Sequence, residues 1–251
     1  MDHSAYIRDT GGDTAVLMIH GIVGTPAHFR ELIPLIPEEW TVHALLLDGH
    51  GGSVAEFSAT SMKTWKGQVK AHLDALLAAH SRVLVAAHSM GTLFAIQAAL
   101  DHPEEIDGLF LLAVPTRPWV RLSTMVTSLR LVLGVERPGD RALAAMAEAT
   151  SVRLERKLWK YVGWLPRYVE LLVEIRRIRR LLPELAVPTM TFQSQRDELV
   201  SARSIRDLEG HPWIKNTVLH GSGHFAYGPE DICLLRRRFQ ALLDGGWRAE
   251  G

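Results

Sequence analysis

Short continuous runs of apolar residues recur along the chain, and stretches with helical spacing separate most of them. Such runs favour strands buried on both faces, because a strand with one wet face alternates apolar and polar residues. The runs lie at 15–20, 42–47, 83–87, 109–114, 189–192 and 217–219. Strands that alternate with helices predict an α/β fold with a mostly parallel, doubly wound sheet.

Three helices are predicted between and after these runs. The segment at 90–100 is rich in small residues, so its helix can pack closely on the sheet, and a last helix is expected at about 229–243. The third helix is predicted earlier in the chain, where apolar residues three or four positions apart form one helix face. They are Met62, Trp65, Val69, Leu73 and Leu76.

The segment between 115 and 188 contains no convincing strand. Prolines stand at both of its ends, and its apolar residues have helical spacing. A βαβ connection does not need this length. We therefore predict one domain, 1–251, with an inserted helical cap at 117–183.

Composition fits one full-sized core, since 47% of the 251 residues are hydrophobic. The 28 Lys and Arg balance the 28 Asp and Glu, and we expect no nucleic-acid partner. Charge is nevertheless uneven: from Arg117 to Leu182, 14 basic minus 6 acidic residues leave +8. The cluster at 176–180 is either a solvated, paired helix face or a surface that attracts anionic substrates or lipids.

Cysteine content and the length of the first apolar run indicate the compartment and the cofactors to expect. Cys233 is its one cysteine, so no internal disulfide forms, and no Cys/His cluster suggests a metal. The first apolar run is too short for a signal sequence or a membrane span. We expect a cytoplasmic protein without stable membrane insertion and without a metal or cofactor. A homodimer through an exposed cap edge is compatible with the sequence.

A candidate nucleophile follows the strand at 83–87. The sequence AHSMG at 87–91 stands between this strand and a helix, as a nucleophile elbow requires. Small residues must stand two places before and after the serine, and Ala87 and Gly91 meet this condition. Ser89 is the expected nucleophile, and the alternative is that it merely caps the helix.

The first strand runs into a glycine-bearing loop, HGIVGTP at 20–26. Acyl transfer needs two donors placed where negative charge develops. The backbone N–H groups of Ile22 in this loop and of Met90 beside Ser89 are the expected pair. We expect His20 to shape the loop rather than to transfer protons.

A serine nucleophile also needs a histidine to take its proton and a carboxylate to orient that histidine. The chain order in a fold with this elbow is serine, acid, histidine. Asp197 follows the strand at 189–192 and is the expected acid, with its neighbour Glu198 as competitor. His224 is the expected base, in the glycine-flanked loop after the last strand, whereas His220 is expected to be packed.

These motifs together resemble the α/β-hydrolase superfamily, and within it bacterial carboxylesterases and monoacylglycerol-lipase-like serine hydrolases. The resemblance rests on HGIVGTP (20–26), DGHGG (48–52), AHSMG (87–91), RDELV (196–200) and SGHF (222–225). It covers most of 13–243 and is weakest across the cap. It implies the α/β-hydrolase fold and cofactor-free hydrolysis of short- to medium-chain acyl esters or monoacylglycerols.

The leading hypothesis is a carboxylesterase that acts through an acyl-enzyme on Ser89, with a small acyl ester as partner. A thioesterase, carbon–carbon hydrolase or acyltransferase with the same triad is the alternative, because the triad does not distinguish them. A non-catalytic binding protein is a third class, disfavoured because all three triad residue types are present. The cap residues expected to wall an acyl pocket are Trp119, Leu122, Met125 and Leu129.

Overall fold

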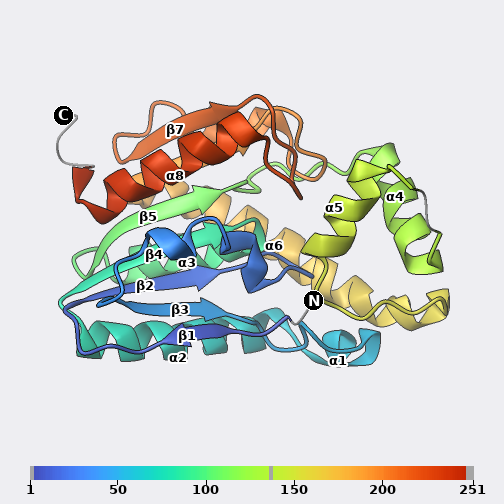
Figure 1. Cartoon of the computed structure of the whole chain (residues 1–251), viewed down its shortest axis with the longest axis horizontal. Helices are drawn as coiled ribbons and strands as arrows, with labels where there is room; N and C mark the ends of the chain where they lie inside the picture. The colour runs from blue at the N-terminus through green and yellow to red at the C-terminus, as the bar shows by residue number, and fades with distance from the viewer. Residues whose placement is uncertain (1–2, 136–137, 247–251) are drawn as a thin grey trace.

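The computed structural model describes residues 3–135 and 138–246, and its centre is a 7-stranded sheet (Figure 1). The strands lie in the order β1-β3-β2-β4-β5-β6-β7. β1 pairs antiparallel with β3 at one edge, and every other pair of neighbours is parallel. The strands are β1 (Tyr6–Arg8), β2 (Thr14–Ile19), β3 (Thr41–Leu45), β4 (Arg82–His88), β5 (Ile106–Leu112), β6 (Thr189–Ser194) and β7 (Ile214–Leu219).

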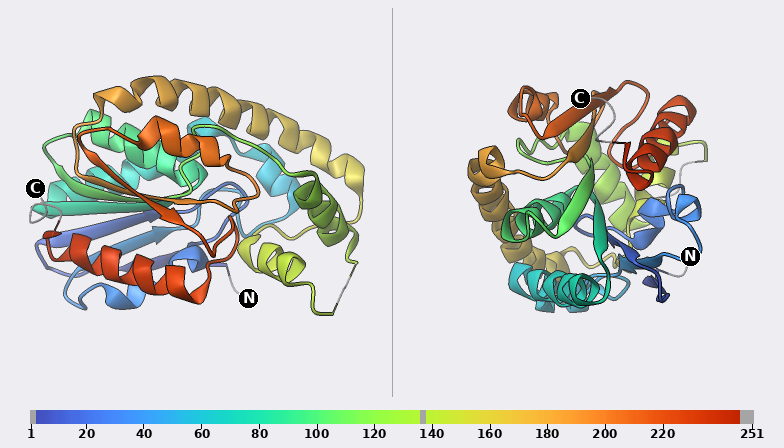
Figure 2. Two further views of the ribbon diagram at one scale, coloured as in Figure 1. Left: turned by 90° about the horizontal axis from the view of Figure 1, so that it is seen from above. Right: turned by 90° about the vertical axis from the view of Figure 1, so that its left-hand side faces the viewer.

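Helices cover both faces of the sheet, which gives three layers (Figure 2). One face carries α2 (Met62–Ala79), α3 (Met90–Asp101) and α6 (Leu165–Leu181), and the opposite face carries α8 (Pro229–Leu243). This arrangement confirms the predicted mostly parallel, doubly wound α/β sheet. The shorter elements are η1 (Pro26–Phe29), η2 (Ile33–Leu35), α1 (Val54–Ala59), α4 (Leu122–Leu133), α5 (Arg141–Ala149), η3 (Leu158–Trp164), η4 (Leu182–Glu184), η5 (Ala202–Ser204) and α7 (Ile205–Leu208).

Burial in two directions explains the continuous apolar runs of the strands. In β4, Val83, Val85 and Ala87 face the side of α2 and α3, whereas Leu84 and Ala86 face the side of α8. Both sets lie in a dry interior, so nothing in the strand alternates with polar residues. β1 differs because it is a three-residue edge strand whose first two residues are exposed. The apolar pattern does not predict it.

The segment predicted as a cap holds α4, α5, η3 and α6. α4 and α5 pack on each other at one end of the molecule (Figures 1 and 2). α6 extends from this end along the sheet, and its Ile175 and Ile178 are buried in the core shared with α3. The predicted limits of the cap, 117–183, stay a prediction.

The sheet reverses its strand order at β2. β3 lies on one side of β2, and β4 through β7 follow on the other side. Ligands of open α/β sheets bind beyond the carboxyl ends of the strands at such a switch point. The loops after β2 and β4 carry HGIVGTP and AHSMG, so both motifs meet there.

Candidate active site

Ser89 stands in the turn between β4 and α3. Its backbone has φ 51° and ψ −119°, which costs roughly 1–3 kcal/mol for a residue with a side chain. Its side chain makes no capping hydrogen bond with α3, so a capping role does not account for it. Gly91 keeps the turn close to β2, because a Cβ at this position would overlap the carbonyl of Ile19. The elbow also places Met90 as the first residue of α3.

The loop after β2 lies directly against the nucleophile. A Cβ on Gly21 would come within 2.9 Å of the Cβ of Ser89, so only glycine allows this approach. His20 fixes the shape of the loop. Its Nδ1–H donates to the carbonyl of Gly21 (2.8 Å), and its Nε2 accepts from the N–H of Leu47 (3.0 Å). Ile22 follows immediately and packs against the core.

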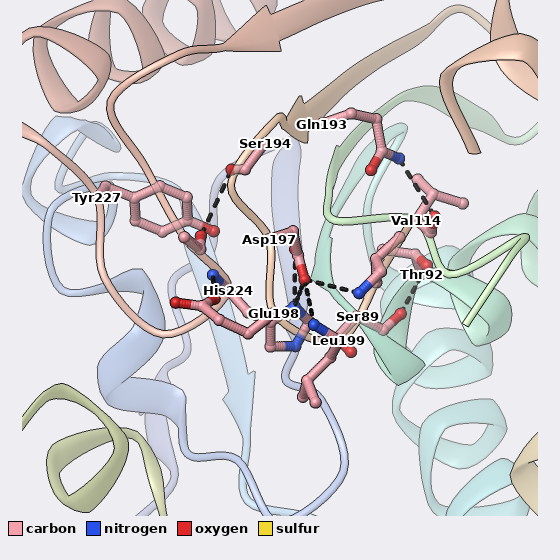
Figure 3. A network of polar contacts seen from close by, with 12 residues as sticks. Ser89, Thr92, Val114, Gln193, Ser194, Asp197, Glu198, Leu199, His224 and Tyr227 are labelled. Atoms are coloured by element: carbon pink, nitrogen blue, oxygen red, sulfur yellow. Dashed lines mark hydrogen bonds and ion pairs between the residues drawn. The ribbon is translucent and has the colours of Figure 1, made fainter. Parts of the chain in front are cut away.

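The structure brings Asp197 and His224 together in the interior (Figure 3). The Nδ1–H of His224 donates to both carboxylate oxygens of Asp197, at 2.9 and 3.1 Å. The carboxylate also accepts the N–H groups of Leu199 (2.8 Å) and Val200 (2.7 Å), which fix its orientation. Of the two acids that the sequence left in competition, it is Asp197 that faces the imidazole.

The charges of this pair shift both pKa values. Burial by itself would lower the pKa of His224, but the charge and hydrogen bond of Asp197 outweigh it, with help from Glu198. The pKa of His224 is therefore raised above its ordinary value. Burial would raise the pKa of Asp197, but the charge and hydrogen bond of His224 and two backbone N–H groups lower it. The carboxylate stays ionised beside a histidine that readily holds a proton.

Two further carboxylates hold the loop of His224, and the sequence motifs did not identify this function. Glu198 accepts the backbone N–H of His224 at 2.6 Å. Asp231, at the start of α8, accepts the N–H of Gly221 (2.9 Å) and the hydroxyl of Ser222 (2.6 Å). The loop is therefore anchored at His224 itself and at Gly221 and Ser222, which precede it.

A stack of histidines connects the nucleophile turn with the His224 loop. The ring of His88, the residue before Ser89, lies 4.8 Å from that of His224. It also stacks on the ring of His28, with the ring centroids 3.7 Å apart. Burial lowers the pKa of His88 well below its ordinary value, so it is neutral at pH 7. His88 thus presents an uncharged surface to the imidazole of His224.

His220 corrects one expectation from the sequence. It directly follows β7, the last strand at this edge of the described sheet, and it is exposed rather than packed. Its Nδ1 lies 3.1 Å from the side-chain oxygen of Gln195, another exposed residue.

The four predicted pocket residues lie on the solvent side of the cap. Their exposed fractions run from 47% to 75%. A small cavity of about 120 Å³ lies elsewhere, next to the His224 loop, and is lined by His28, Glu148, Phe225 and Tyr227 among others. An acyl pocket lined by residues of the cap stays a prediction. The cap residues expected to line it are Trp119, Leu122, Met125 and Leu129.

Comparison with known proteins gives likenesses to lipolytic enzymes and to part of an acyltransferase. A metagenome-derived lipolytic enzyme has a TM-score of 0.73 at 20% identity, with 97% of this chain and 98% of that chain covered. A monoacylglycerol lipase of Paleococcus ferrophilus has a TM-score of 0.69 at 16% identity, with 98% and 100% covered. At these identities the likeness shows the fold alone.

A sequence relative matches over a shorter stretch. The dihydrolipoyllysine-residue acetyltransferase component of the acetoin cleaving system of Cupriavidus necator is 35% identical over 103 residues. The match spans 40% of this chain and about a quarter (26%) of that protein's length. The family model of the alpha/beta hydrolase fold matches residues 14–177, which is more than half of the chain. The chain therefore belongs to the α/β-hydrolase fold family.

Proposed function

We propose that the protein is a serine hydrolase that cleaves carboxylic esters through an acyl-enzyme on Ser89. The observation that carries the proposal is the buried hydrogen bond between His224 and Asp197, beside a serine at positive φ. This combination provides a nucleophile, a base and an orienting acid from three different loops. The three residues lie near the switch point of the sheet, and open α/β sheets bind ligands in the crevice at this point.

In the proposed reaction, neutral His224 takes the proton of the Ser89 hydroxyl as its oxygen attacks the ester carbonyl. The N–H groups of Ile22 and Met90 stabilise the resulting oxyanion. The carbon–oxygen bond then breaks, and the alcohol leaves with the proton held by His224. Water attacks the acyl-enzyme with help from the same histidine and releases the acid. Asp197 holds the tautomer and stabilises the imidazolium throughout.

Hydrolysis of p-nitrophenyl esters from acetate to palmitate tests the proposal. We expect Ser89→Ala to lower kcat by about a thousandfold or more, because the attacking oxygen is lost. The matched control is Ser81→Ala, an exposed serine before the opposite end of β4, which should retain full activity. A fluorophosphonate should label the wild type and not Ser89→Ala. Full activity in Ser89→Ala, or no labelling of the wild type, contradicts the proposal.

Acyl transfer is the second candidate, and the partial match to an acetyltransferase component favours it. The acyl-enzyme would be the same, but an alcohol or thiol would replace water as the acceptor. Product analysis with an ester substrate and an added thiol or alcohol distinguishes the two reactions. Free acid as the main product supports hydrolysis, and a new ester or thioester as the main product supports transfer.

A further inference from the structure

Helix α4 turns its apolar side to solvent. Five large apolar side chains recur every three or four positions and form one stripe along it, with exposed fractions from 39% to 75%. The stripe consists of Leu122, Met125, Val126, Leu129 and Leu133. We call it the α4 stripe.

The opposite side of α4 is mixed, because it carries Thr124 and Thr127 together with the half-buried Leu131. Its buried residue is Thr124, and the hydroxyl of Ser128 points to the sulfur of Met146 in α5 at 3.4 Å. A helix on the surface of a globular protein normally does the reverse and buries its apolar side. The described residues leave the α4 stripe open to solvent over much of its length, as its exposed fractions show.

A second apolar group lies at the same end of the molecule. In η3, Leu158, Trp159 and Val162 are 49%, 70% and 63% exposed. Arg156 connects this group to α4, because a Cβ on Gly134, the C-cap of α4, would lie 3.0 Å from its guanidinium. Figures 1 and 2 both show α4 and the chain leading into α6 at this end.

Cations without acidic partners surround these apolar groups. Arg121 lies at the start of α4, Arg130 lies on the side of α4, and Arg156 and Lys157 lie where the chain enters η3. Among the described residues, none of these four forms an ion pair. Two acidic side chains of the same region are neutralised, Glu155 by Lys160 and Glu148 by Arg30, whereas Asp140 caps α5 and leaves the cations in excess. The local surface is therefore both apolar and net cationic.

We propose that the α4 stripe and the exposed residues of η3 dock on an anionic lipid surface. The apolar side chains enter the boundary between headgroups and acyl chains, and the cations meet lipid phosphates. A symmetric second copy fits less well, because it would place cation against cation. The contact is peripheral, since none of the helices described here is both long and apolar enough to cross a bilayer.

Vesicle flotation tests this docking independently of any enzymatic activity. The probes are vesicles of phosphatidylcholine alone and of phosphatidylcholine mixed with phosphatidylglycerol. We expect the bound fraction to be about tenfold higher on the anionic vesicles and to fall as salt is added. Trp159→Ser should release most of the bound protein, and Arg130→Gln with Arg156→Gln should remove the preference for anionic lipid.

The matched control is Trp213→Ser, an exposed tryptophan outside the cap that precedes β7. It should bind vesicles as the wild type does, and circular dichroism melts check that each variant is folded. No binding to anionic vesicles, equal binding to both vesicle types, or equal losses in Trp159→Ser and Trp213→Ser would overturn the proposal. So would a dimer in light scattering that Trp159→Ser converts to a monomer.

Discussion

Asp197 and Glu198 are neighbours in the chain, but they hold His224 in different ways. The carboxylate of Asp197 faces the imidazole, whereas that of Glu198 accepts the backbone N–H of the same residue. Glu198 is thus a positioning residue that also contributes negative charge. That charge is one of the causes that raise the pKa of His224.

Replacing Glu198 by glutamine separates these two contributions. Glu198→Gln keeps an acceptor for the N–H of His224 but removes the charge, so the pKa of His224 falls. The proposed base works when neutral, and activity therefore rises with pH through this pKa. We expect the acid limb of kcat/KM to move to lower pH by about one unit or less.

Two further variants complete this experiment. Glu198→Ala also loses the acceptor, so its kcat should fall as the loop loosens. Glu209→Gln removes an exposed acidic charge beyond α7 and should leave the pH profile unchanged. An acid limb that stays in place or moves to higher pH in Glu198→Gln would show that the charge of Glu198 does not act on His224.

At the scale of elements, the junction of β4 with α3 depends on a close approach to β2. Gly91→Ala adds a Cβ against the carbonyl of Ile19, and we expect it to lower the free energy of unfolding by about 1–3 kcal/mol. Gly67→Ala is the matched control, because Gly67 lies exposed within α2 with nothing within 4 Å of an added Cβ. It should stabilise the protein by about 0.5–1 kcal/mol. Urea unfolding of both variants measures the difference, and equal effects would show that the approach to β2 is not tight.

The sequence predicted elements well where burial leaves a periodic signal. β2 to β7, α2, α3 and α8 follow their apolar patterns. Chain order and the loops after the late strands led to the prediction of Asp197 and His224, whose side chains lie within hydrogen-bond distance. β1 left no such signal, because its side chains are exposed. The contact of His28 with His88 joins positions far apart in the chain, which no local spacing encodes. The spacing in α4 predicted a helix but not the side that faces solvent, because that depends on what packs beside it.

Across the whole molecule, the buried histidines connect the site with stability. Burial lowers the pKa of His50 to about 4 and that of His28 to about 3, and it lowers the pKa values of His20 and His88 well below 6.5. His20, His50 and His88 are buried and His28 is half-buried in the folded protein, and all four are solvated in the unfolded chain. Between pH 6.5 and the folded pKa values, the unfolded chain therefore binds more protons than the folded protein. His224 differs, because its raised pKa adds stability that is lost as pH rises through that value.

Stability should consequently fall as the pH drops from 6.5 to 5. Each of the four histidines contributes a slope that grows toward about 1.4 kcal/mol per pH unit as the pH falls through this window, because folding excludes a proton that the unfolded chain takes up. Urea unfolding at pH 6.5, 6.0, 5.5 and 5.0 measures the slope. His50→Phe should reduce that slope by about a quarter, whatever its effect on absolute stability, because His50 is one of these four histidines. His220→Phe changes an exposed histidine and should leave it unchanged. A flat profile in the wild type would mean that these imidazoles take up protons without unfolding, and that the interior around the site is wetter than its packing indicates.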